Sequence, residues 1–544
     1  MIAFEGRVTP ATRAESVYLY LPFDVPAGAE RIGVRYAFEA GSILDLGLFD
    51  PEVRPFPSTT GFRGWSGSAR REAFVSATEA TPGYIAGPLQ AGRWQVVLGL
   101  ALVDDGGCDY RVTVEVTAGS PGAEPVGPPP DRPTTKASYS LGIGAGLPSE
   151  QATAQPATHP AAHPAARSAD HPAARFATHS AARPAAPAAG RTWYRGDLQS
   201  HTYYSDARGS LPDLLAEARS RALDFLAITD HNTSSHHLEL GRWSAGGPTS
   251  AGLLLVPGEE VTTYRGHANV WGVGGWTDFR IERPGDLARL VRQVNERGGL
   301  FSVNHPKVTP GCLGCDWEYE VPDGAASLEA WQGPWLMRNW DSLARYDALL
   351  RAGRRLTLVG GSDRHHPGYP NHDQPFLQVG SPTTWLELTE PSVPAVLDAI
   401  RAGRAFVSEA PEGPFLELGV GGVGMGGAVA MGNAGAGMVG EGGGGTVAAA
   451  ARVGGAAGDV LTWIGSGGVL RETVIAGDDF TDEWEWPAQG PYLRVEVVAR
   501  ASLPGFLDEL ARFEAAGRLP PYLKREEVVA NPWRRALSNP VYVE

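Results

Sequence analysis

The chain has few cysteines, no long hydrophobic run and a deficit of positive charge. Three cysteines in 544 residues are too few for the disulfide framework of a small secreted domain. A spanning helix needs about 18 consecutive apolar residues, and the sequence contains no such run. The opening ten residues also lack the basic and apolar regions of a signal peptide. We therefore expect a cytoplasmic protein with no membrane partner.

The net charge of −15 results from 46 basic and 61 acidic side chains. Because nucleic acid is bound through clustered positive charge, this balance disfavours long nucleic acid as a partner. The length is sufficient for several domains, and a hydrophobic content of 42% is sufficient for ordinary cores. The sequence does not specify the oligomeric state.

Residues 1–118 show the alternation of β-strands. Val34 and Tyr36 alternate with polar or small residues, as do Val112 and Val114. A period of two indicates one buried face and one exposed face. Because turn signals separate these runs and no long helical pattern intervenes, we predict an N-terminal β-sandwich.

Residues 119–190 have the composition of a disordered linker. The tetrad x-Pro-Ala-Ala recurs from His159, His163, His171 and Arg183, and large apolar side chains are scarce. Such a tract cannot form a core, and we expect proteases to cut here before they cut the following region. Its four histidines could capture a metal, but a low-complexity spacer is the preferred interpretation.

Residues 191–412 alternate short apolar runs with helical patterns, which predicts a parallel α/β sheet or barrel. The apolar runs 223–228, 253–256, 300–303 and 356–359 are each followed by residues that could bind a ligand. Helical periodicity covers 211–221, 286–297 and 343–351. In α/β barrels the active site lies at the carboxyl ends of the strands, so we expect it here.

Residues 413–458 are predicted to be a glycine-rich, flexible insertion, with 13 glycines between 421 and 445. Gly422, Gly424 and Gly427 match a dinucleotide-binding pattern, but composition alone produces this match and no helix pattern follows. Residues 459–544 return to strand patterns, so we predict a small β-rich region there.

The distribution of histidine is the strongest functional signal. Nine of the 13 histidines fall in 191–412, and most follow a predicted strand: His201, His231, His236, His237, His267, His305, His365, His366 and His372. Acidic residues accompany them at Asp206, Asp230, Glu260 and Asp363. Imidazole and carboxylate together suit Zn, Mn or Fe, and so many candidates indicate more than one ion. Clustered ions would polarise an ester and convert bound water to hydroxide, whereas the alternative is a set of solvated loop histidines.

Five motifs follow one another within residues 196–366: Gly196 to Thr202 with Ser205-Asp206, Ile228 to Asn232, Pro257 to Thr262 with Gly266 to Asn269, Asn304 to Pro306, and Gly361 to His365. Together they resemble the motifs of the PHP (polymerase and histidinol phosphatase) superfamily. The preceding strands, together with Glu329 to Gln332, Pro382 to Trp385 and Ser538 to Tyr542, resemble its carbaryl-hydrolase-like (CehA/McbA) branch. The resemblance covers most of the chain outside the linker and the glycine-rich segment.

This resemblance implies a distorted (βα)7 barrel that holds two metal ions, with one or three as alternatives. By motif, His201, Glu260 and Asp363 would bind one ion. Glu260 would bridge to a second ion held by His267 and His305, and a third would lie between Asp206, His231 and His365. Asp230 would orient a ligand.

The sequence departs from the family at Gln199, where a histidine is usual. A neutral amide oxygen is a weaker ligand for zinc, so we expect this metal position to be weakly filled. Asp206, Asp230 or a loop histidine, His366 being our choice, would shuttle protons. Arg364, His366 and His372 could bind an anionic substrate group or could simply be solvated.

These observations predict a metal-dependent hydrolase in which metal-bound hydroxide cleaves a small phosphoester or a carboxyl or carbamate ester. Within enzymes, the alternative is a nucleotide phosphatase or exonuclease. A degraded, non-catalytic scaffold that acts as a binding protein is the other alternative, and the loss at Gln199 favours it. Cys312 and Cys315 could form half a zinc site or a redox pair, but we interpret them as loop thiols.

Overall fold

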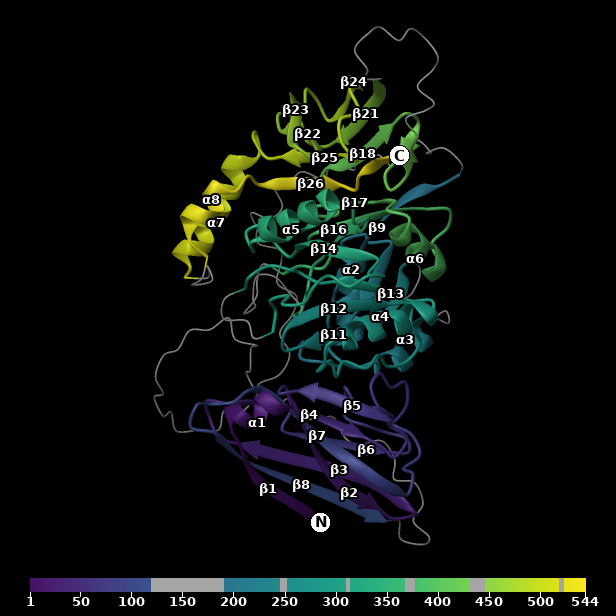
Figure 1. Cartoon of the computed structure of the whole chain (residues 1–544), viewed down its shortest axis with the longest axis vertical. Coiled ribbons are helices and arrows are strands. Elements are labelled where there is room, and N and C mark those ends of the chain that lie inside the picture. The colour runs from purple at the N-terminus through teal and green to yellow at the C-terminus, as the bar shows by residue number, and fades with distance from the viewer. Residues whose placement is uncertain (119–189, 245–251, 310–313, 367–376, 431–445, 518–522) are drawn as a thin grey trace, which may run out of the picture.

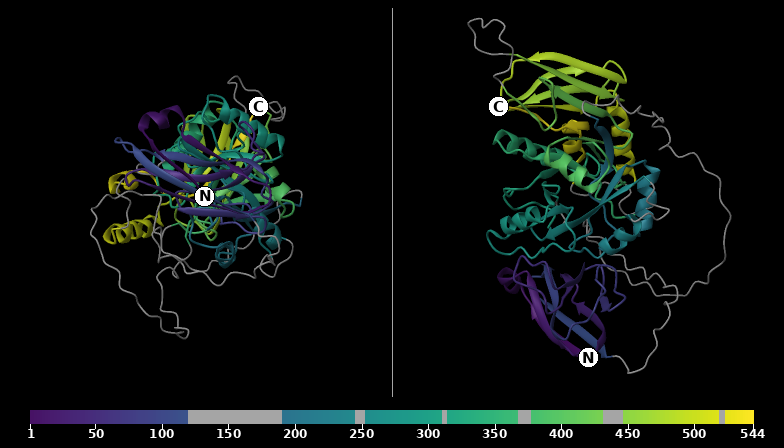
Figure 2. Two further views of the ribbon diagram at one scale, coloured as in Figure 1. Left: turned by 90° about the horizontal axis from the view of Figure 1, so that it is seen from below. Right: turned by 90° about the vertical axis from the view of Figure 1, so that its right-hand side faces the viewer.

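The computed structural model describes residues 1–118, 190–244, 252–309, 314–366, 377–430, 446–517 and 523–544. The linker tract up to residue 189, His372 and residues 431–445 lie outside these ranges, so the predictions made for them stay predictions. Three groups of sheets follow one another along the long axis of the molecule (Figures 1 and 2). We call them the N-terminal sheets, the central sheet and the C-terminal sheets.

The N-terminal sheets are two four-stranded antiparallel sheets, ordered β1-β8-β3-β6 and β2-β7-β4-β5. The strands are β1 (Ile2–Val8), β2 (Tyr18–Val25), β3 (Ala29–Phe38), β4 (Ile43–Phe49), β5 (Phe62–Gly67), β6 (Glu72–Ser76), β7 (Gly92–Leu102) and β8 (Cys108–Ala118), with the short helix α1 (Pro10–Glu15). Side chains of both sheets, such as Val34, Val112, Leu46 and Leu98, share one buried cluster. Burial alternates along β3 as predicted, whereas β4 and β5 are buried on both faces.

The central sheet runs in the order β15-β14-β13-β12-β11-β10-β9-β16-β17. Its strands are β9 (Thr192–Asp197), β10 (Phe225–Ile228), β11 (Leu254–Thr263), β12 (Gly266–Trp271), β13 (Leu300–Val303), β14 (Ser327–Gln332), β15 (Thr357–Gly361), β16 (Thr383–Leu388) and β17 (Ala405–Ser408). The accompanying helices are α2 (Leu211–Ser220), α3 (His237–Ser244), α4 (Asp286–Glu296), α5 (Asn339–Arg351) and α6 (Val393–Arg401). The chain thus has a mixed α/β fold, and α2, α4 and α5 confirm the three helices predicted from periodicity.

The predicted parallel pairing holds for only part of the central sheet. Strands β10 and β11 pair in parallel, as do β13 with β14 and β14 with β15, but β12 pairs antiparallel with both β11 and β13. Only Tyr264 and Arg265 separate β11 from β12. A two-residue connection forms a hairpin, whereas a parallel pair needs a long crossover.

The two outer strands of the run β9 to β15 meet each other just beyond the last residues of β9 and β15. Ser200 and Arg364 form an isolated parallel bridge, and the Asp363 N–H donates to the Gln199 carbonyl at 3.0 Å. The N–H of His201 donates in turn to the Arg364 carbonyl at 2.9 Å. This contact brings the first and last predicted ligand motifs together.

Aromatic side chains join the N-terminal sheets to the central sheet. Phe62 stacks on Trp276 with ring centroids 4.6 Å apart, and Trp65 lies 4.6 Å from Phe279. These rings belong to a buried cluster that also contains residues of the central sheet. Because aromatic burial contributes strongly to interfaces, we expect the two parts to stay docked.

The C-terminal sheets begin inside the segment predicted to be a flexible insertion. Strands β18 (Phe415–Val420), β19 (Val423–Gly424), β20 (Ala428–Val429) and β21 (Val447–Gly454) lie within 413–458, so its described flanks belong to sheets. The remaining strands are β22 (Val460–Gly465), β23 (Gly468–Val474), β24 (Asp479–Trp486), β25 (Tyr492–Val498), β26 (Arg534–Ser538) and β27 (Val541–Val543). Two further helices, α7 (Leu503–Ala515) and α8 (Arg525–Ala530), were not predicted.

Strand β26 pairs antiparallel with β17 and thereby continues the central sheet into the C-terminal sheets. The Asn539 side chain, which follows β26, accepts from the Leu358 N–H and donates to the carbonyls of Leu358 and Ala405. It thus binds the edges of β15 and β17 together. No helix within the described residues is long and apolar enough to cross a bilayer.

Candidate metal centre

The predicted ligands lie where strands β9 to β15 end or pair. His201, His231 and His305 each follow a strand by a few residues, and Asp363 and His365 follow β15. Two ligands differ from this pattern, because Glu260 lies inside β11 and His267 lies inside β12. The hairpin between them turns both side chains toward the ends of the neighbouring strands.

The Glu260 carboxylate is the centre of the site. It is fully buried, and its Oε2 lies 2.9 Å from His231 Nδ1 and 3.4 Å from His201 Nε2. Its Oε1 lies 3.4 Å from His267 Nδ1 and 3.5 Å from His305 Nε2. Four imidazoles therefore surround a single carboxylate.

Three overlapping groups have potential ligand atoms within 4.8 Å of one another. They are His201 with Glu260 and Asp363, Glu260 with His267 and His305, and His201 with His231 and His365. The first two groups are the sets that the resemblance implied. The third contains His201 in place of Asp206, although Asp206 Oδ1 lies 3.6 Å from His231 Nε2 and 3.4 Å from His365 Nε2.

Several of these atoms are buried without a hydrogen-bond partner. Among the described residues they include His201 Nε2, Asp206 Oδ1, Glu260 Oε2 and His267 Nε2. A buried polar atom that lacks a partner costs about 1–3 kcal/mol. Cations bound in the overlapping groups would give such atoms partners, and their nitrogen and oxygen chemistry suits Zn, Mn or Fe. The residues therefore fit a metal centre.

The electrostatics keep the carboxylates ionised. Burial raises the pKa of Glu260, but His231 and His267 outweigh it and hold that pKa well below its usual range. The pKa values of Asp206 and Asp363 are lowered in the same way, with His365 the leading cause in both. Such carboxylates bind a cation at neutral pH without first losing a proton.

The imidazoles divide into two kinds. Burial lowers the pKa of His201 and of His267, so their rings are neutral and able to bind a metal. Burial also opposes charge on His231, but Glu260 and Asp206 raise its pKa to about 9. Asp206 and Asp363 raise the pKa of His365 to about 10 against the same effect of burial. Without a cation, these two rings therefore carry the positive charge of the site.

Gln199 contacts the centre through its amide nitrogen. Its Nε2 donates to Glu260 Oε1 at 3.1 Å and to Asp363 Oδ1 at 3.3 Å, and the side chain is fully buried. In this arrangement Gln199 acts as a hydrogen-bond donor to two ligands, whereas the sequence predicted that it stands at a metal position.

The three residues predicted to move protons occupy different environments. Asp206 faces His231 and His365 as described above. Asp230 is fully buried and accepts hydrogen bonds from the Thr202 backbone N–H, the Thr202 hydroxyl and the Ser205 hydroxyl. It therefore holds the 202–205 loop in place. The His366 ring is half-buried, with its centroid 6.4 Å from that of His365.

Other predicted residues support the structure around the site. His236 and His237 both donate through Nε2 to the Gly258 carbonyl, at 3.1 and 2.9 Å. Arg364 is fully buried and donates twice to Glu217 Oε2, so it is not a solvated loop residue. Cys315 is disulfide-bonded, which makes the prediction of a free thiol wrong there, whereas Cys108 is a buried free thiol.

A polar chain that the sequence analysis missed supports Asp363. Gln332 Nε2 donates to Asp363 Oδ2 at 2.7 Å, and Lys307 Nζ donates to Gln332 Oε1 at 2.7 Å and to Asn339 Oδ1 at 2.9 Å. Burial lowers the pKa of Lys307 to about 7. Gln332 lies in the Glu329 to Gln332 motif, and Lys307 directly follows Asn304 to Pro306, so proximity to these motifs was the available signal.

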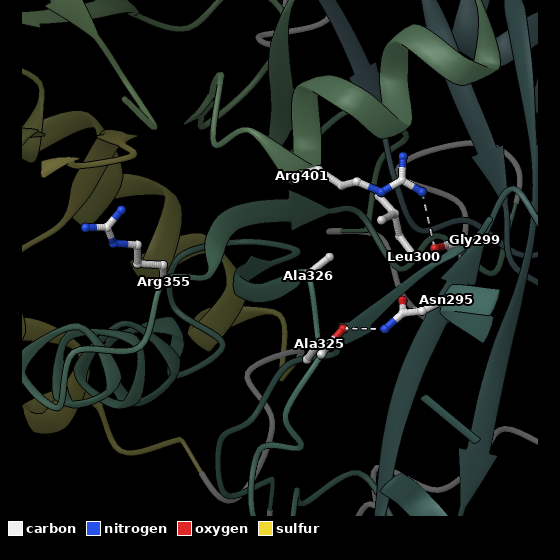
Figure 3. A pocket seen from close by; sticks show the side chains of 8 residues that line it. Asn295, Gly299, Leu300, Ala325, Ala326, Arg355 and Arg401 are labelled. Atoms are coloured by element: carbon white, nitrogen blue, oxygen red, sulfur yellow. Dashed lines mark hydrogen bonds between the residues drawn. The ribbon is translucent and has the colours of Figure 1, made fainter. Parts of the chain in front are cut away.

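A cavity of about 340 Å³ lies at the ends of the strands opposite to the metal centre, beside Leu300 at the start of β13 (Figure 3). Its polar side chains include Asn295, Arg355 and Arg401. Arg401 donates to the Gly298 carbonyl and Asn295 to the Gly324 carbonyl, so both already support the backbone. This cavity is separate from the metal centre.

No protein-family model matches the chain, and no curated protein matches it. A solved structure with similarity is a two-domain protein containing a predicted PHP-like metal-dependent phosphoesterase from Bacteroides vulgatus ATCC 8482. It has 16% identity and a TM-score of 0.34, over 57% of this chain and 91% of that one. Another is an amidohydrolase from Chromobacterium violaceum with bound sulfate, with 15% identity and a TM-score of 0.22, over 32% of this chain and 88% of that one. Because both TM-scores are below 0.5, the function of these proteins is not transferred to this chain.

Proposed function

We propose that the chain is a metal-dependent hydrolase that cleaves an ester bond in a small molecule. The observation that carries this proposal is the set of buried nitrogen and oxygen atoms around Glu260 that converge without hydrogen-bond partners. Bound Zn, Mn or Fe would polarise the ester and lower the pKa of water, which is the chemistry that ester hydrolysis needs.

Different residues would hold each of these ions. His201, Glu260 and Asp363 would hold one ion, and Glu260, His267 and His305 would hold a second. Asp206, His231 and His365 offer a third position. The three groups found among the described residues contain no thiolate, and such a harder donor set suits Mn or Fe as well as Zn.

The exposure of the ligands indicates the side from which substrate enters. The Asp206, Asp363, His231 and His365 side chains are 12–19% exposed, whereas those of His201, Glu260, His267 and His305 are 0–8% exposed. We therefore place the substrate beside Asp206. Its carboxylate is ionised, and in a site whose third ion position is empty it accepts the proton released from water and returns it to the leaving group.

The order of the five sequence motifs supports membership of the PHP superfamily and, through the residues outside them, of its carbaryl-hydrolase-like branch. The proposed fold is the distorted (βα)7 barrel for strands β9 to β15, preceded by a β-sandwich and followed by a small β-rich domain. Membership of the superfamily predicts phosphoester substrates, and membership of the carbaryl-hydrolase-like branch predicts carboxyl or carbamate esters. The charge of −15 supports a small substrate over a polynucleotide.

The test is a screen of the purified, metal-stripped chain. Hydrolysis of p-nitrophenyl phosphate, bis-p-nitrophenyl phosphate and p-nitrophenyl acetate is measured before and after addition of Mn, Zn or Fe. We expect activity only with metal, and the preferred ester identifies the substrate class. His237→Gln is the matched control for loss of a histidine outside the ligand groups. Full activity in chain shown to be metal-free by elemental analysis would contradict the proposal, and tight metal binding without hydrolysis of any ester would favour a binding protein.

A further inference from the structure

The loop that carries Asp206 is held from two sides. On its inner side, Asp230 accepts hydrogen bonds from Thr202 and Ser205, as described above. On its outer side, Arg70 of the N-terminal sheets donates through Nη1 to the Ser205 carbonyl at 2.8 Å and through Nη2 to the Tyr203 carbonyl. Ser205 is the residue immediately before Asp206, so the guanidinium fixes the backbone from which this ligand extends.

The N-terminal sheets approach this loop closely at a second point. Gly83 has a φ of +95°, and a Cβ there would lie 2.7 Å from the Tyr204 carbonyl oxygen. Thr233, two residues after His231, donates to the Gly83 carbonyl at 2.9 Å. Two segments of the metal centre therefore contact residues that lie more than 100 positions earlier in the chain.

This contact satisfies groups that would otherwise be costly. Buried backbone carbonyls need donors, and the planar fork of arginine can serve two of them at once. The Asp206 and Asp230 carboxylates also lie within electrostatic reach of the Arg70 guanidinium. Without it, the Tyr203 and Ser205 carbonyls lose their donors, and the loop can rotate Asp206 away from His231 and His365.

We infer that Arg70 is a positioning residue for the metal centre: it places Asp206, so that the ion position formed by Asp206, His231 and His365 requires the docked N-terminal sheets. This inference rests on the proposed metal centre and adds to it a dependence on the other part of the chain. Residues that support metal ligands from behind typically contribute 10–100-fold to affinity.

The experiment compares metal binding by the full chain and its variants. Arg70→Met keeps the length of the side chain but removes the donors, and Arg71→Met is the matched control, because the neighbouring guanidinium lies 3.8 Å above the Phe38 ring within the N-terminal sheets. Stripped protein is dialysed against a Mn²⁺ series, and bound metal is measured by elemental analysis. We expect Arg70→Met to weaken one equivalent by about 10–100-fold and Arg71→Met to match the wild type.

Two further variants separate positioning from a general loss of structure. Asp206→Asn should weaken the same equivalent, and Arg70→Met combined with Asp206→Asn should bind no more weakly than Asp206→Asn alone, because both changes act on one ligand. Arg70→Lys supplies one nitrogen for two carbonyls and should give an intermediate affinity. Additive losses, or weakening of every equivalent together, would overturn the inference.

Hydrogen exchange gives a readout that does not need metal. In Arg70→Met we expect faster exchange of the amides of residues 202–206 and unchanged exchange in β13. Unchanged protection of 202–206 would overturn the inference by itself. A wild-type chain that binds no metal would instead overturn the proposed function, and the exchange result would still decide whether Arg70 holds the loop.

Discussion

Replacing Gln199 by glutamate would test whether this side chain faces the ligand carboxylates. In Gln199→Glu an oxygen takes the place of the Nε2 atom, which lies 3.1 Å from Glu260 Oε1 and 3.3 Å from Asp363 Oδ1. At an effective dielectric constant of about 20, two like charges at this separation repel by about 5 kcal/mol. Two such repulsions exceed the cost of binding a proton, so the new carboxyl should be protonated in the metal-free native state.

Proton uptake limits the loss of stability and gives it a definite pH dependence. Glutamate in the unfolded chain has a pKa near 4.3, so keeping it protonated costs about 1.4 kcal/mol for each pH unit above that value, or roughly 5 kcal/mol at pH 8 and 1 kcal/mol at pH 5. The folded-state pKa is raised, so the penalty is absent below the unfolded pKa and grows as the pH rises. A bound divalent cation should remove most of it.

The assay is urea unfolding of metal-free protein at pH 5 and pH 8, followed by circular dichroism, with and without Mn²⁺. Gln332→Glu is the matched control, because Gln332 also contacts Asp363 but accepts from Lys307. A new carboxylate there would raise the lowered pKa of Lys307 and so be compensated by its ammonium. We expect a much smaller loss of unfolding free energy in that variant. Equal stability of Gln199→Glu and the wild type at pH 8, or a deficit that does not change with pH, would refute the reasoning.

Three further predictions follow from the same contacts. His305→Ala and Asp363→Asn should each lose at least one metal equivalent and nearly all ester hydrolysis while circular dichroism stays unchanged; wild-type metal content in either would place the ligands elsewhere. Glu217→Ala should destabilise the chain by about 3 kcal/mol, because it leaves the fully buried Arg364 guanidinium without its carboxylate, and a neutral result in urea unfolding would show that another group compensates. Tyr264→Phe removes a 2.6 Å hydrogen bond to Asp45, a carboxyl whose pKa burial raises to about 7. Because the phenol favours the ionised form, the loss of stability should be small at pH 5 and should grow to about 2 kcal/mol at pH 9, and a loss independent of pH would contradict this account.

Local sequence patterns located most of the candidate site. His231, His305 and Asp363 could be found because each follows a short buried strand at which polar residues have no packing role. Glu260 and His267 were found by motif, but their position inside a hairpin was not, because the apolar run 253–256 gives no sign that the strand continues to Thr263. Local patterns also cannot distinguish His236 and His237 from the proposed ligands. Both rings bond the Gly258 carbonyl, and this contact depends on the tertiary fold.

Contacts between distant segments were beyond prediction. Nothing near Arg70 in the sequence distinguishes it from Arg71, yet one reaches the Asp206 loop and the other lies over a ring of its own sheet. The chain from Lys307 through Gln332 to Asp363 likewise joins distant segments, and motif proximity marks its members without showing that they bond to one another. Hydrophobic periodicity specifies which face of an element is buried, but not which polar groups meet across the fold.

The side chain of Asn539 has a consequence for the order in which the protein can form on the ribosome. It supplies bonds to Leu358 and Ala405, and β26 just before it is the partner of β17. Until residue 539 has emerged, β15, the strand that leads to Asp363, lacks the side-chain bonds that tie it to β17, although every proposed metal ligand has already been translated. Metal capture should therefore be delayed until after the C-terminal sheets emerge, and a nascent chain halted before β26 should leave the ligands made but unassembled.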